Sequence, residues 1–294
     1  MLIARLIAGS SDWETQLHSA HVAFATAGVS LVSGKKLGSA SDVIELRLAD
    51  ADFGSVHSVL NMTFGNCDAL VARGEIKVPS LFVSDMDSTM IGQECIDELA
   101  DYAGLKDRIA DITERAMQGE LDFESALRER VGLLEGLDES AIAQCLEERI
   151  SPMDGAMTLV STLKAHGCRC VLVTGGFHHF GDRVAEWLDF DRVVGNRLGV
   201  AEGKLTGLLD GPISDANTKL ATLREEAERL PQGATILASG DGANDIPMIE
   251  AADYGFAFRA KPKARAAANG RIDKGDLTNI LSLLGIDRKD WVEA

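Results

Sequence analysis

The sequence predicts an α/β protein in two parts: a doubly wound parallel sheet that carries a helical insert, and a smaller α+β domain in front of it. Two observations predict the sheet: three short apolar runs each end in polar residues or glycine, and helical patterns separate them along the chain. Such runs are typical of parallel strands that are buried on both faces. A third observation, a different order of patterns before residue 78, predicts the smaller domain.

The first 77 residues alternate between strand-like and helix-like patterns. Strand-like runs lie at 2–8, 29–34, 42–48 and 68–74, and helix-like stretches lie at 13–26 and 55–64. The resulting order, strand, helix, strand, strand, helix, strand, is that of a ferredoxin-like sandwich. We therefore expect residues 1–77 to form a separate α+β domain.

The second domain is expected to begin at residue 78, because Pro79 cannot donate a ladder hydrogen bond and suits the start of a strand. Its predicted strands are LFVSD (81–85), CRCVLVTGG (168–176) and ATILASGDG (234–242). Between the first two of them, residues 95–150 are helical by their periodicity. Because this stretch directly follows the first strand, we interpret it as a helical cap on a core that extends over 78–294.

The composition argues against several classes of protein. With 46% hydrophobic and 26% charged residues, the chain has the composition of an ordinary soluble protein. A formal net charge of −17 repels phosphate, so neither nucleic acid nor an anionic membrane is an expected partner. The first residues fit neither a signal peptide nor a spanning helix, since Arg5 interrupts their short apolar run, and we expect a cytoplasmic location. The five cysteines show no metal or redox spacing.

Polar residues directly follow the predicted strands. In open α/β sheets, ligands bind outside the carboxyl ends of the strands, so these residues are candidates for a binding site. Three groups stand at such ends and a fourth residue lies on a predicted helix: Asp85 with Asp87, Thr174 with Gly175 and Gly176, Asp241 with Asn244 and Asp245, and Lys219. Each has a common structural explanation when taken alone: an N-cap, a turn with positive φ, or a solvated lysine. GDGAND could also be a calcium-like loop, but it lacks the later Glu of an EF-hand.

Together the four groups supply what phosphoryl transfer requires. Asp85, Asp241 and Asp245 offer the carboxylate oxygens that suit Mg²⁺. One carboxylate can act as a nucleophile and form an aspartyl-phosphate, and a second carboxyl two residues later can protonate the leaving oxygen. A hydroxyl, a backbone amide and a lysine ammonium can spread the charge of the phosphoryl oxygens.

Four motifs, DMDST, VTGGF, the isolated Lys219 and GDGAND, resemble in order and spacing those of the haloacid dehalogenase superfamily of aspartate-nucleophile phosphatases. More narrowly, DMDSTMIGQECIDELA, MQGELDFESALRERVGLLEGL, NRLGVAEGKLTG and GDGANDIPMI resemble the phosphoserine phosphatase branch of that superfamily. The similarity runs from about Pro79 to about Asp276. It implies a Rossmann-like core with a helical cap and Mg²⁺ as the cofactor.

The resemblance also implies a role for each matching residue. Asp85 corresponds to the nucleophile and a metal ligand, and Asp87 to the general acid and base whose backbone carbonyl reaches the metal. Asp241 corresponds to the other direct metal ligand and Asp245 to its supporting carboxylate. The phosphate-binding positions are Thr174, Gly175 and Lys219, with Asn244 close by. The family more often has Ser at the position of Thr174, and the hydroxyl is kept.

Recognition of an amino-acid substrate requires partners for its ammonium and its carboxylate. Glu94 and Arg130 match the family positions with these roles, and a carboxylate and a planar guanidinium suit them chemically. Their structural alternatives are a helix-start residue for Glu94 and a surface ion pair for Arg130. Met117 and Phe123 match apolar cap residues over the substrate, although Met and Phe on helices are also common core residues.

The function implied is hydrolysis of O-phosphoserine to serine and phosphate, the last step of serine biosynthesis. One alternative is a phosphatase or phosphotransferase for another small phosphomonoester, such as phosphohomoserine or phosphothreonine. Another is a non-catalytic amino-acid sensor, which would have no need of the four motifs together. The first 77 residues lie outside the resemblance, and their pattern suggests an ACT-like regulatory domain or a dimerisation module that pairs through a sheet edge into a homodimer.

Overall fold

The computed structural model describes residues 1–294 apart from 8–12, 38–41, 50, 66, 118–120 and 294. Residues 2–73, which we call the amino-terminal unit, form β1 (Leu2–Ile7), α1 (Trp13–Thr26), β2 (Leu31–Lys36), β3 (Val43–Leu48), α2 (Phe53–Phe64) and β4 (Asp68–Arg73). Their strands are antiparallel in the order β2-β3-β1-β4. Helix α2 begins two residues earlier than its pattern predicts, because the Asp52 carboxylate caps it by accepting from the Ser55 amide.

Alternation along β1 gives the amino-terminal unit two packed faces. Leu2, Ala4 and Leu6 point to one face and pack with residues of α1 and α2 such as Phe24. Ile3 points to the other face and belongs to the hydrophobic core of the rest of the molecule. The unit is therefore packed against the larger core through the back of its sheet.

The larger part of the chain forms a parallel sheet with helices on both faces, as the apolar runs predict. Its elements are β5 (Leu81–Ser84), α7 (Ala156–Ala165), β6 (Arg169–Phe177), α8 (His178–Leu188), β7 (Arg192–Asn196), α9 (Ala216–Glu228), β10 (Ile236–Gly240), η1 (Ala243–Asp245), α10 (Ile246–Ala251), β11 (Tyr254–Phe258), α11 (Pro262–Ala267), β12 (Gly270–Ile272), α12 (Thr278–Leu284) and η2 (Arg288–Asp290). Neighbouring strands in the order β12-β11-β10-β5-β6-β7 are parallel.

Successive residues of the central strands point to opposite faces of the sheet, and both faces are covered. Leu81 and Val83 of β5 pack with Leu223 of α9 on one face. Phe82 packs on the other face in the cluster that holds Leu163 of α7 and Phe180 of α8. This burial on both sides explains why the strands are uniformly apolar and lack the alternation of a half-exposed sheet.

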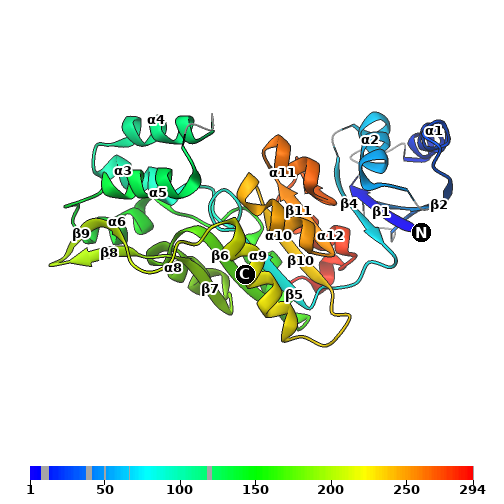
Figure 1. Ribbon diagram of the computed structural model, residues 1–294. Helices are drawn as coiled ribbons and strands as arrows, with labels where there is room; N and C mark the ends of the chain where they lie inside the picture. Colours follow the sequence, from blue (N-terminus) through cyan, green and yellow to red (C-terminus); the bar gives the residue numbers. More distant parts are fainter. Residues whose placement is uncertain (8–12, 38–41, 50, 66, 118–120, 294) are drawn as a thin grey trace.

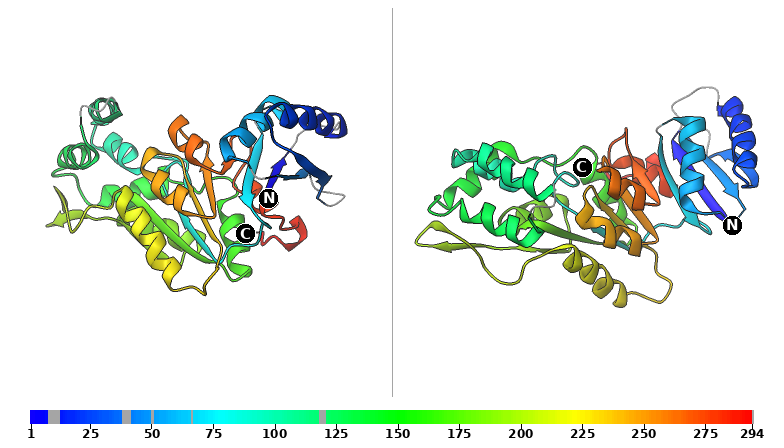
Figure 2. Two further views of the ribbon diagram at one scale, coloured as in Figure 1. Left: turned by 45° about the vertical axis from the view of Figure 1, so that its right-hand side comes forward. Right: turned by 45° about the horizontal axis from the view of Figure 1, so that its top comes forward.

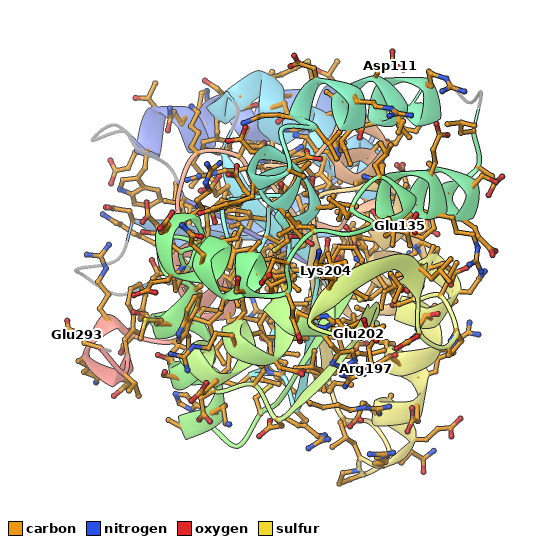
Figure 3. The ribbon with its side chains drawn as sticks, turned by 90° about the vertical axis from the view of Figure 1, so that its left-hand side faces the viewer. Asp111, Glu135, Arg197, Glu202, Lys204 and Glu293 are labelled. Atoms are coloured by element: carbon orange, nitrogen blue, oxygen red, sulfur yellow. The ribbon has the colours of Figure 1, made fainter. Side chains whose placement is uncertain are left out.

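Four helices lie between β5 and α7: α3 (Cys95–Tyr102), α4 (Lys106–Met117), α5 (Phe123–Gly132) and α6 (Ser140–Arg149). We call residues 95–149 the helical insert. Figure 1 shows it at the end of the molecule opposite the amino-terminal unit, and both views in Figure 2 agree. The hairpin of β8 (Leu198–Ala201) and β9 (Lys204–Leu209) extends to the insert, where the Gly136 amide donates to Leu205 O at 2.8 Å. Figure 3 labels Glu135 and Lys204 at this contact.

The two parts of the chain share one sheet, which the sequence patterns do not reveal. Strand β4 pairs antiparallel with β12 through Gly270↔Leu70 and Arg271↔Ala69, so ten of the described strands form one sheet from β2 to β7, and β8 and β9 form a separate two-stranded sheet. We found no helix, among the residues described, with the length and apolar character needed to cross a membrane.

Candidate active site

A cavity of about 130 Å³ opens at the carboxyl ends of β5, β6 and β10, where the sequence places its polar groups. Nine of the predicted site residues line it: Asp85, Asp87, Glu94, Phe123, Arg130, Thr174, Gly175, Asp241 and Asn244. The remaining lining residues are Ile96, Leu127, Gly176, Phe177 and Lys261. Residues of the core strands and of the helical insert thus meet around one small, polar space.

Lys219 lies beneath this cavity and is fully buried. Helix α9 begins at the Asp215 cap, whose carboxylate accepts from the Thr218 amide, and this start places Lys219 in the first turn. Its Nζ lies 2.6 Å from Asp85 Oδ1 and 2.6 Å from Asp245 Oδ1. Burial opposes the charged ammonium, but the two carboxylates raise the pKa of Lys219 above its ordinary value. Lys219 is therefore a fixed cation, not a solvated helix residue.

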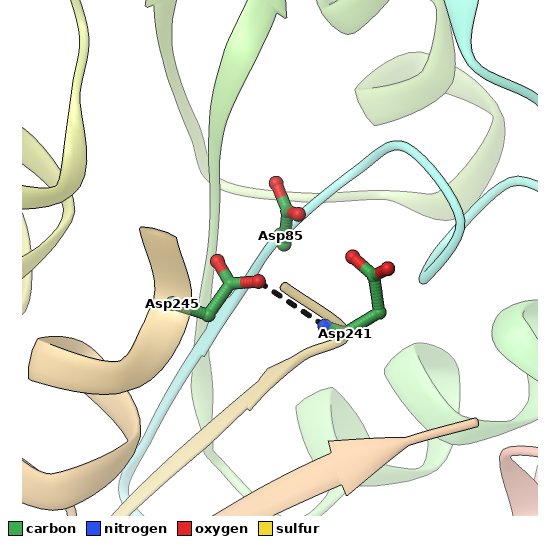
Figure 4. Close-up of side chains that lie close together, drawn as sticks. All are labelled: Asp85, Asp241 and Asp245. Atoms are coloured by element: carbon green, nitrogen blue, oxygen red, sulfur yellow. Dashed lines mark hydrogen bonds between the residues drawn. The ribbon is translucent and has the colours of Figure 1, made fainter. Parts of the chain in front are cut away.

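Three carboxylates lie close together, as Figure 4 shows for Asp85, Asp241 and Asp245, and the first two of them line the cavity. One oxygen of each lies within 4.8 Å of the others, which is close enough for all three to share one metal ion. Burial, reinforced by the Asp245 charge, raises the pKa of Asp85 well above its usual value, although Lys219 opposes the shift. A cation among the three would favour the ionised carboxylates, so this donor set of hard oxygens fits Mg²⁺.

The loop after β10 holds Asp245 in place with backbone donors. The amides of Asp241 and Gly242 donate to Asp245 Oδ2 at 3.1 and 2.9 Å. A Cβ on Gly240 would lie 2.3 Å from Asp245 Cγ, so only glycine permits this close approach. The glycines of GDGAND therefore help to hold the Asp245 carboxylate in place: Gly240 leaves space for it, and the Gly242 amide donates to it. This role distinguishes the loop from an ordinary turn.

Asp87 faces the same cavity from the turn after β5. Its Oδ1 accepts from the Cys95 amide at 3.0 Å, and Thr174 Oγ1 lies 3.4 Å from its Oδ2. Burial, followed by the nearby Glu94 charge, raises the pKa of Asp87 to about 6. A carboxyl with this pKa can hold a proton near neutral pH and then release it. The chain turns sharply directly afterwards, since Ser88 has a φ of 54°.

The segment 174–176 is supported by side chains that the sequence analysis did not single out. Asn196 Nδ2 donates to Gly175 O at 2.7 Å, and Ser214 Oγ donates to Thr174 O at 2.8 Å. A Cβ on Gly176 would lie 2.6 Å from Asp87 Oδ2, so this glycine too is required by a close approach. Asn196 is the first residue of NRLG and the last residue of β7. Its position at the end of a strand is the signal that could have identified it as a residue of the site.

The insert and its connection contribute Glu94, Phe123 and Arg130. Glu94 is exposed and accepts from Ser88 Oγ at 2.7 Å. Arg130 Nε donates to Ala126 O at 3.3 Å, and burial lowers the pKa of Arg130 despite the nearby carboxylates. The Phe123 ring lies 3.4 Å from the position that a Cβ on Gly175 would take. The side chain of Met117, the remaining predicted residue, lies outside the part of the structure that is described.

Lys261 is a cavity residue that the sequence analysis missed. Its amide donates to Asp241 O at 2.9 Å, and its Nζ lies 3.7 Å from Asp241 Oδ2. It follows β11, whose apolar run YGFAF (254–258) is a further strand that ends at the same edge of the sheet. Reading that run as a strand would have brought Lys261 to the site by the same rule that identified Asp241.

Comparisons with known proteins agree with this geometry. The haloacid dehalogenase-like hydrolase family matches residues 82–250. A phosphoserine phosphatase of Lactococcus lactis is 44% identical over 205 residues, which are 69% of this chain and 94% of that protein. A phosphoserine phosphatase of Haemophilus influenzae is 42% identical over 69% of this chain, but the match spans only 65% of that relative's length.

Solved structures give the same assignment. A hydrolase of this family from Salmonella enterica superposes with a TM-score of 0.81 at 27% identity, over 97% of this chain and 99% of that one. A probable phosphoserine phosphatase from Vibrio cholerae gives a TM-score of 0.73 at 31% identity, over 97% of this chain and 86% of that one. A substrate-bound phosphoserine phosphatase gives 0.64 at 38% identity, over 70% and 98%. The chain belongs to the haloacid dehalogenase-like hydrolase family.

Proposed function

We propose that this protein is a Mg²⁺-dependent phosphoserine phosphatase, which hydrolyses O-phosphoserine to serine and inorganic phosphate. The observation that carries the proposal is that Asp85, Asp87, Glu94 and Arg130 line one small cavity above the buried Lys219. The first pair supplies the chemistry of phosphoryl transfer, and the second pair suits the two charged ends of an amino acid. Relatives that carry the name phosphoserine phosphatase support the choice of substrate.

The proposed reaction has two steps. An Asp85 oxygen attacks phosphorus, the bond from phosphorus to the serine oxygen breaks, and Asp87 gives its proton to that oxygen. Asp87 then takes a proton from water, whose oxygen attacks phosphorus and displaces Asp85. Thr174, the Gly175 amide and Lys219 would hold the phosphoryl oxygens. Mg²⁺, held by Asp85 and Asp241 with Asp245 in support, would supply positive charge against the phosphate.

The ends of the substrate would be recognised from the side of the insert. Glu94 would receive the ammonium and Arg130 the carboxylate, since a guanidinium presents a planar fork that matches a carboxylate. Phe123 would cover the substrate from α5, with Met117 as a second apolar residue. We propose that the insert acts as a cap, since exclusion of water strengthens the interactions inside such a site.

We further propose that residues 1–77 are an ACT-like regulatory or dimerisation domain and that residues 78–294 are the catalytic domain. The observed strand order β2-β3-β1-β4 supports the first assignment. The exposed edge strand β2, with Val32 64% exposed, offers a surface for a homodimer. A cytoplasmic location suits the proposed reaction, which draws on the soluble pool of amino-acid precursors.

A phosphate-release assay against a panel of phosphomonoesters tests the proposal. We expect phosphoserine to be preferred over phosphothreonine and phosphohomoserine, with activity that is lost in EDTA and restored by Mg²⁺.

Replacing Arg130 by Ala should raise the KM for phosphoserine roughly tenfold or more, because the carboxylate loses a charged partner. Metal-independent hydrolysis, or an unchanged KM in the Arg130→Ala variant, would contradict the proposal. The matched control is Arg128→Ala, which removes an exposed arginine that pairs with Glu124 on the same helix.

A further inference from the structure

A buried carboxylate of the amino-terminal unit is held by a loop of the core. Asp68, the first residue of β4, is only 3% exposed and has no ion pair with any described residue. Its Oδ1 accepts from the amides of Asp273 and Lys274 at 2.7 and 2.9 Å. Its Oδ2 accepts from the Gly275 amide at 2.9 Å and from Asn279 Nδ2 at 2.7 Å. Charge-assisted bonds to a buried carboxylate are strong, so Asp68 fixes the shape of residues 273–277, which we call the anchor loop.

The anchor loop is shaped to receive this carboxylate. A Cβ on Gly275 would lie 1.8 Å from Asn279 Nδ2 and 2.7 Å from Asp68 Oδ2, so no other residue fits there without movement. The contact joins two elements that are more than two hundred residues apart in the sequence.

The other end of the anchor loop lies against the base of the helical insert. Two chain segments connect the insert to the core, residues 90–94 and 150–155, which we call the neck. They are joined by the bridge of Ile91 with Pro152 and by the Met153 amide, which donates to Met90 O at 2.8 Å. Gln93 and Ser151 join them further, since the Ser151 amide donates to Gln93 Oε1 at 3.2 Å and Gln93 Nε2 donates to Ser151 Oγ at 3.3 Å. The Leu277 amide of the anchor loop donates to Asp154 O at 3.2 Å. The anchor loop thus adds a hydrogen bond from the core to the segment 150–155 of the neck.

A second connection runs through Arg259, the residue after β11. Its Nη2 donates to Gly275 O at 3.2 Å, and its Nη1 lies 3.8 Å from Met153 Sδ in the neck. Its backbone is in the left-handed region, with a φ of 43°, which is costly for a residue with a side chain and persists only where its surroundings hold it. The anchor loop and the neck are thus tied to each other by two separate contacts.

We propose that Asp68 is a positioning residue for the catalytic site: it fixes the anchor loop, and the anchor loop fixes the neck from which the helical insert is placed over the cavity. Glu94 lies at the end of one neck segment, and Arg130 lies in the insert. Loss of the Asp68 contacts therefore misplaces the two groups that face the amino-acid end of the substrate. Asp85, Lys219 and Asp241, which lie on or directly after elements of the core, stay in position. The inference rests on the proposed function only for its kinetic readout.

The variant Asp68→Asn tests the proposal with little change of shape, since an amide puts an NH₂ group against two of the four donors. In hydrogen–deuterium exchange, we expect faster exchange in residues 273–279 and also in 150–155, with residues 169–177 unchanged. We expect kcat/KM for phosphoserine to fall about fivefold, a coupling of ordinary size between distant sites. For p-nitrophenyl phosphate, which has neither ammonium nor carboxylate, kcat/KM should change less than about twofold.

The control is Glu75→Gln, which removes an exposed carboxylate beside β4 that pairs with Arg47. Asn279→Ala removes one of the four bonds from the core side and serves as a milder variant if Asp68→Asn is poorly folded. Faster exchange in the anchor loop without faster exchange in the neck would overturn the proposal, as would an equal loss with both substrates. A wild-type protein that does not hydrolyse phosphoserine would refute the proposed function, whereas the exchange result would still decide the coupling.

Discussion

Lys219 shows how a single buried residue sets the electrostatics of the site. Without it, Asp85 and Asp245 would be two buried like charges that repel each other. The ammonium, 2.6 Å from each, compensates for one negative charge and leaves room for a cation to compensate for the others. Lys219, which is distant from Asp85 in the sequence, thus stabilises both buried aspartates because the fold places it beneath them.

Replacement of Asp85 by Asn should abolish phosphoserine turnover, with a loss of at least about a thousandfold, because an amide cannot form the acyl-phosphate. The same variant should fail to trap beryllium fluoride, which fluorine NMR can measure independently of turnover. The control variant Asp182→Asn, which changes an exposed carboxylate that contacts His178, should behave as wild type. Retained activity in Asp85→Asn would show that another residue is the nucleophile.

His57 of α2 makes the stability of the amino-terminal unit sensitive to acid. Neither of its ring nitrogens has a hydrogen-bond partner among the described residues, and burial, with Arg271 nearby, lowers its pKa from 6.5 to about 3. Below pH 6.5 His57 binds a proton in the unfolded chain, but in the folded protein it binds one only near pH 3. The free energy of unfolding therefore decreases as the pH falls through that range. Other charges close to the ring are those of Arg265 and Asp273.

Between about pH 6.5 and about pH 4.5, we expect this histidine to reduce the free energy of unfolding by about 2–3 kcal/mol. Urea unfolding at both pH values should show a smaller pH dependence in His57→Leu than in the wild type. His21→Leu, at an exposed position of α1, should keep the wild-type dependence. An equal pH dependence in all three proteins would exclude His57 as its source.

Helix α9 is the element that delivers Lys219, and a buried acid fastens it to the sheet. The side chain of Glu226 is fully buried and pairs with Arg169 of β6 and, at 2.6 Å, with Arg192 of β7. Burial opposes the charge of Glu226, but hydrogen bonds from the two arginines lower its pKa below the ordinary value. The ion pairs thus join α9 to two strands at the end of the helix opposite Lys219.

Replacement of Glu226 by Ala should lower the free energy of unfolding by about 2 kcal/mol, since it leaves two partly buried arginines without their shared partner. The neighbouring Glu228→Ala, on the exposed side of the same helix, should change it by less than about 0.5 kcal/mol. Chemical denaturation of the two variants measures the difference. A stability of Glu226→Ala equal to that of Glu228→Ala would mean that apolar packing alone fixes the helix.

The same scale shows what a sequence reveals about a site. Asp85, Thr174 and Asp241 could be predicted because each follows an apolar run, and parallel strands bring their carboxyl ends to one edge. Lys261 was missed because the run before it was not read as a strand. The contact of Asp68 with the anchor loop could not be predicted, since three of its four hydrogen bonds are donated by backbone amides, which carry no sequence signature.

At the scale of the whole molecule, the pairing of β4 with β12 makes the amino-terminal unit an edge cover for the parallel sheet. A chain that begins at residue 78 would leave β12 with unpaired backbone groups and expose the apolar surface beneath Ile3 and Leu70. We expect such a chain to self-associate, and light scattering after size-exclusion chromatography would show it. A monodisperse monomer would indicate that the core closes its own edge.

The distance along the chain between β4 and β12 also orders the events of biosynthesis. Strand β4 ends at Arg73, but its partner β12 begins only at Gly270. While the ribosome makes the residues between them, the amino-terminal unit can fold, but one side of its sheet has no neighbour and Asp68 has no amides to bind. Pairing of β4 with β12 therefore has to follow the synthesis of the strands that lie between them in the sequence, so this long-range contact forms later than the local contacts of the amino-terminal unit.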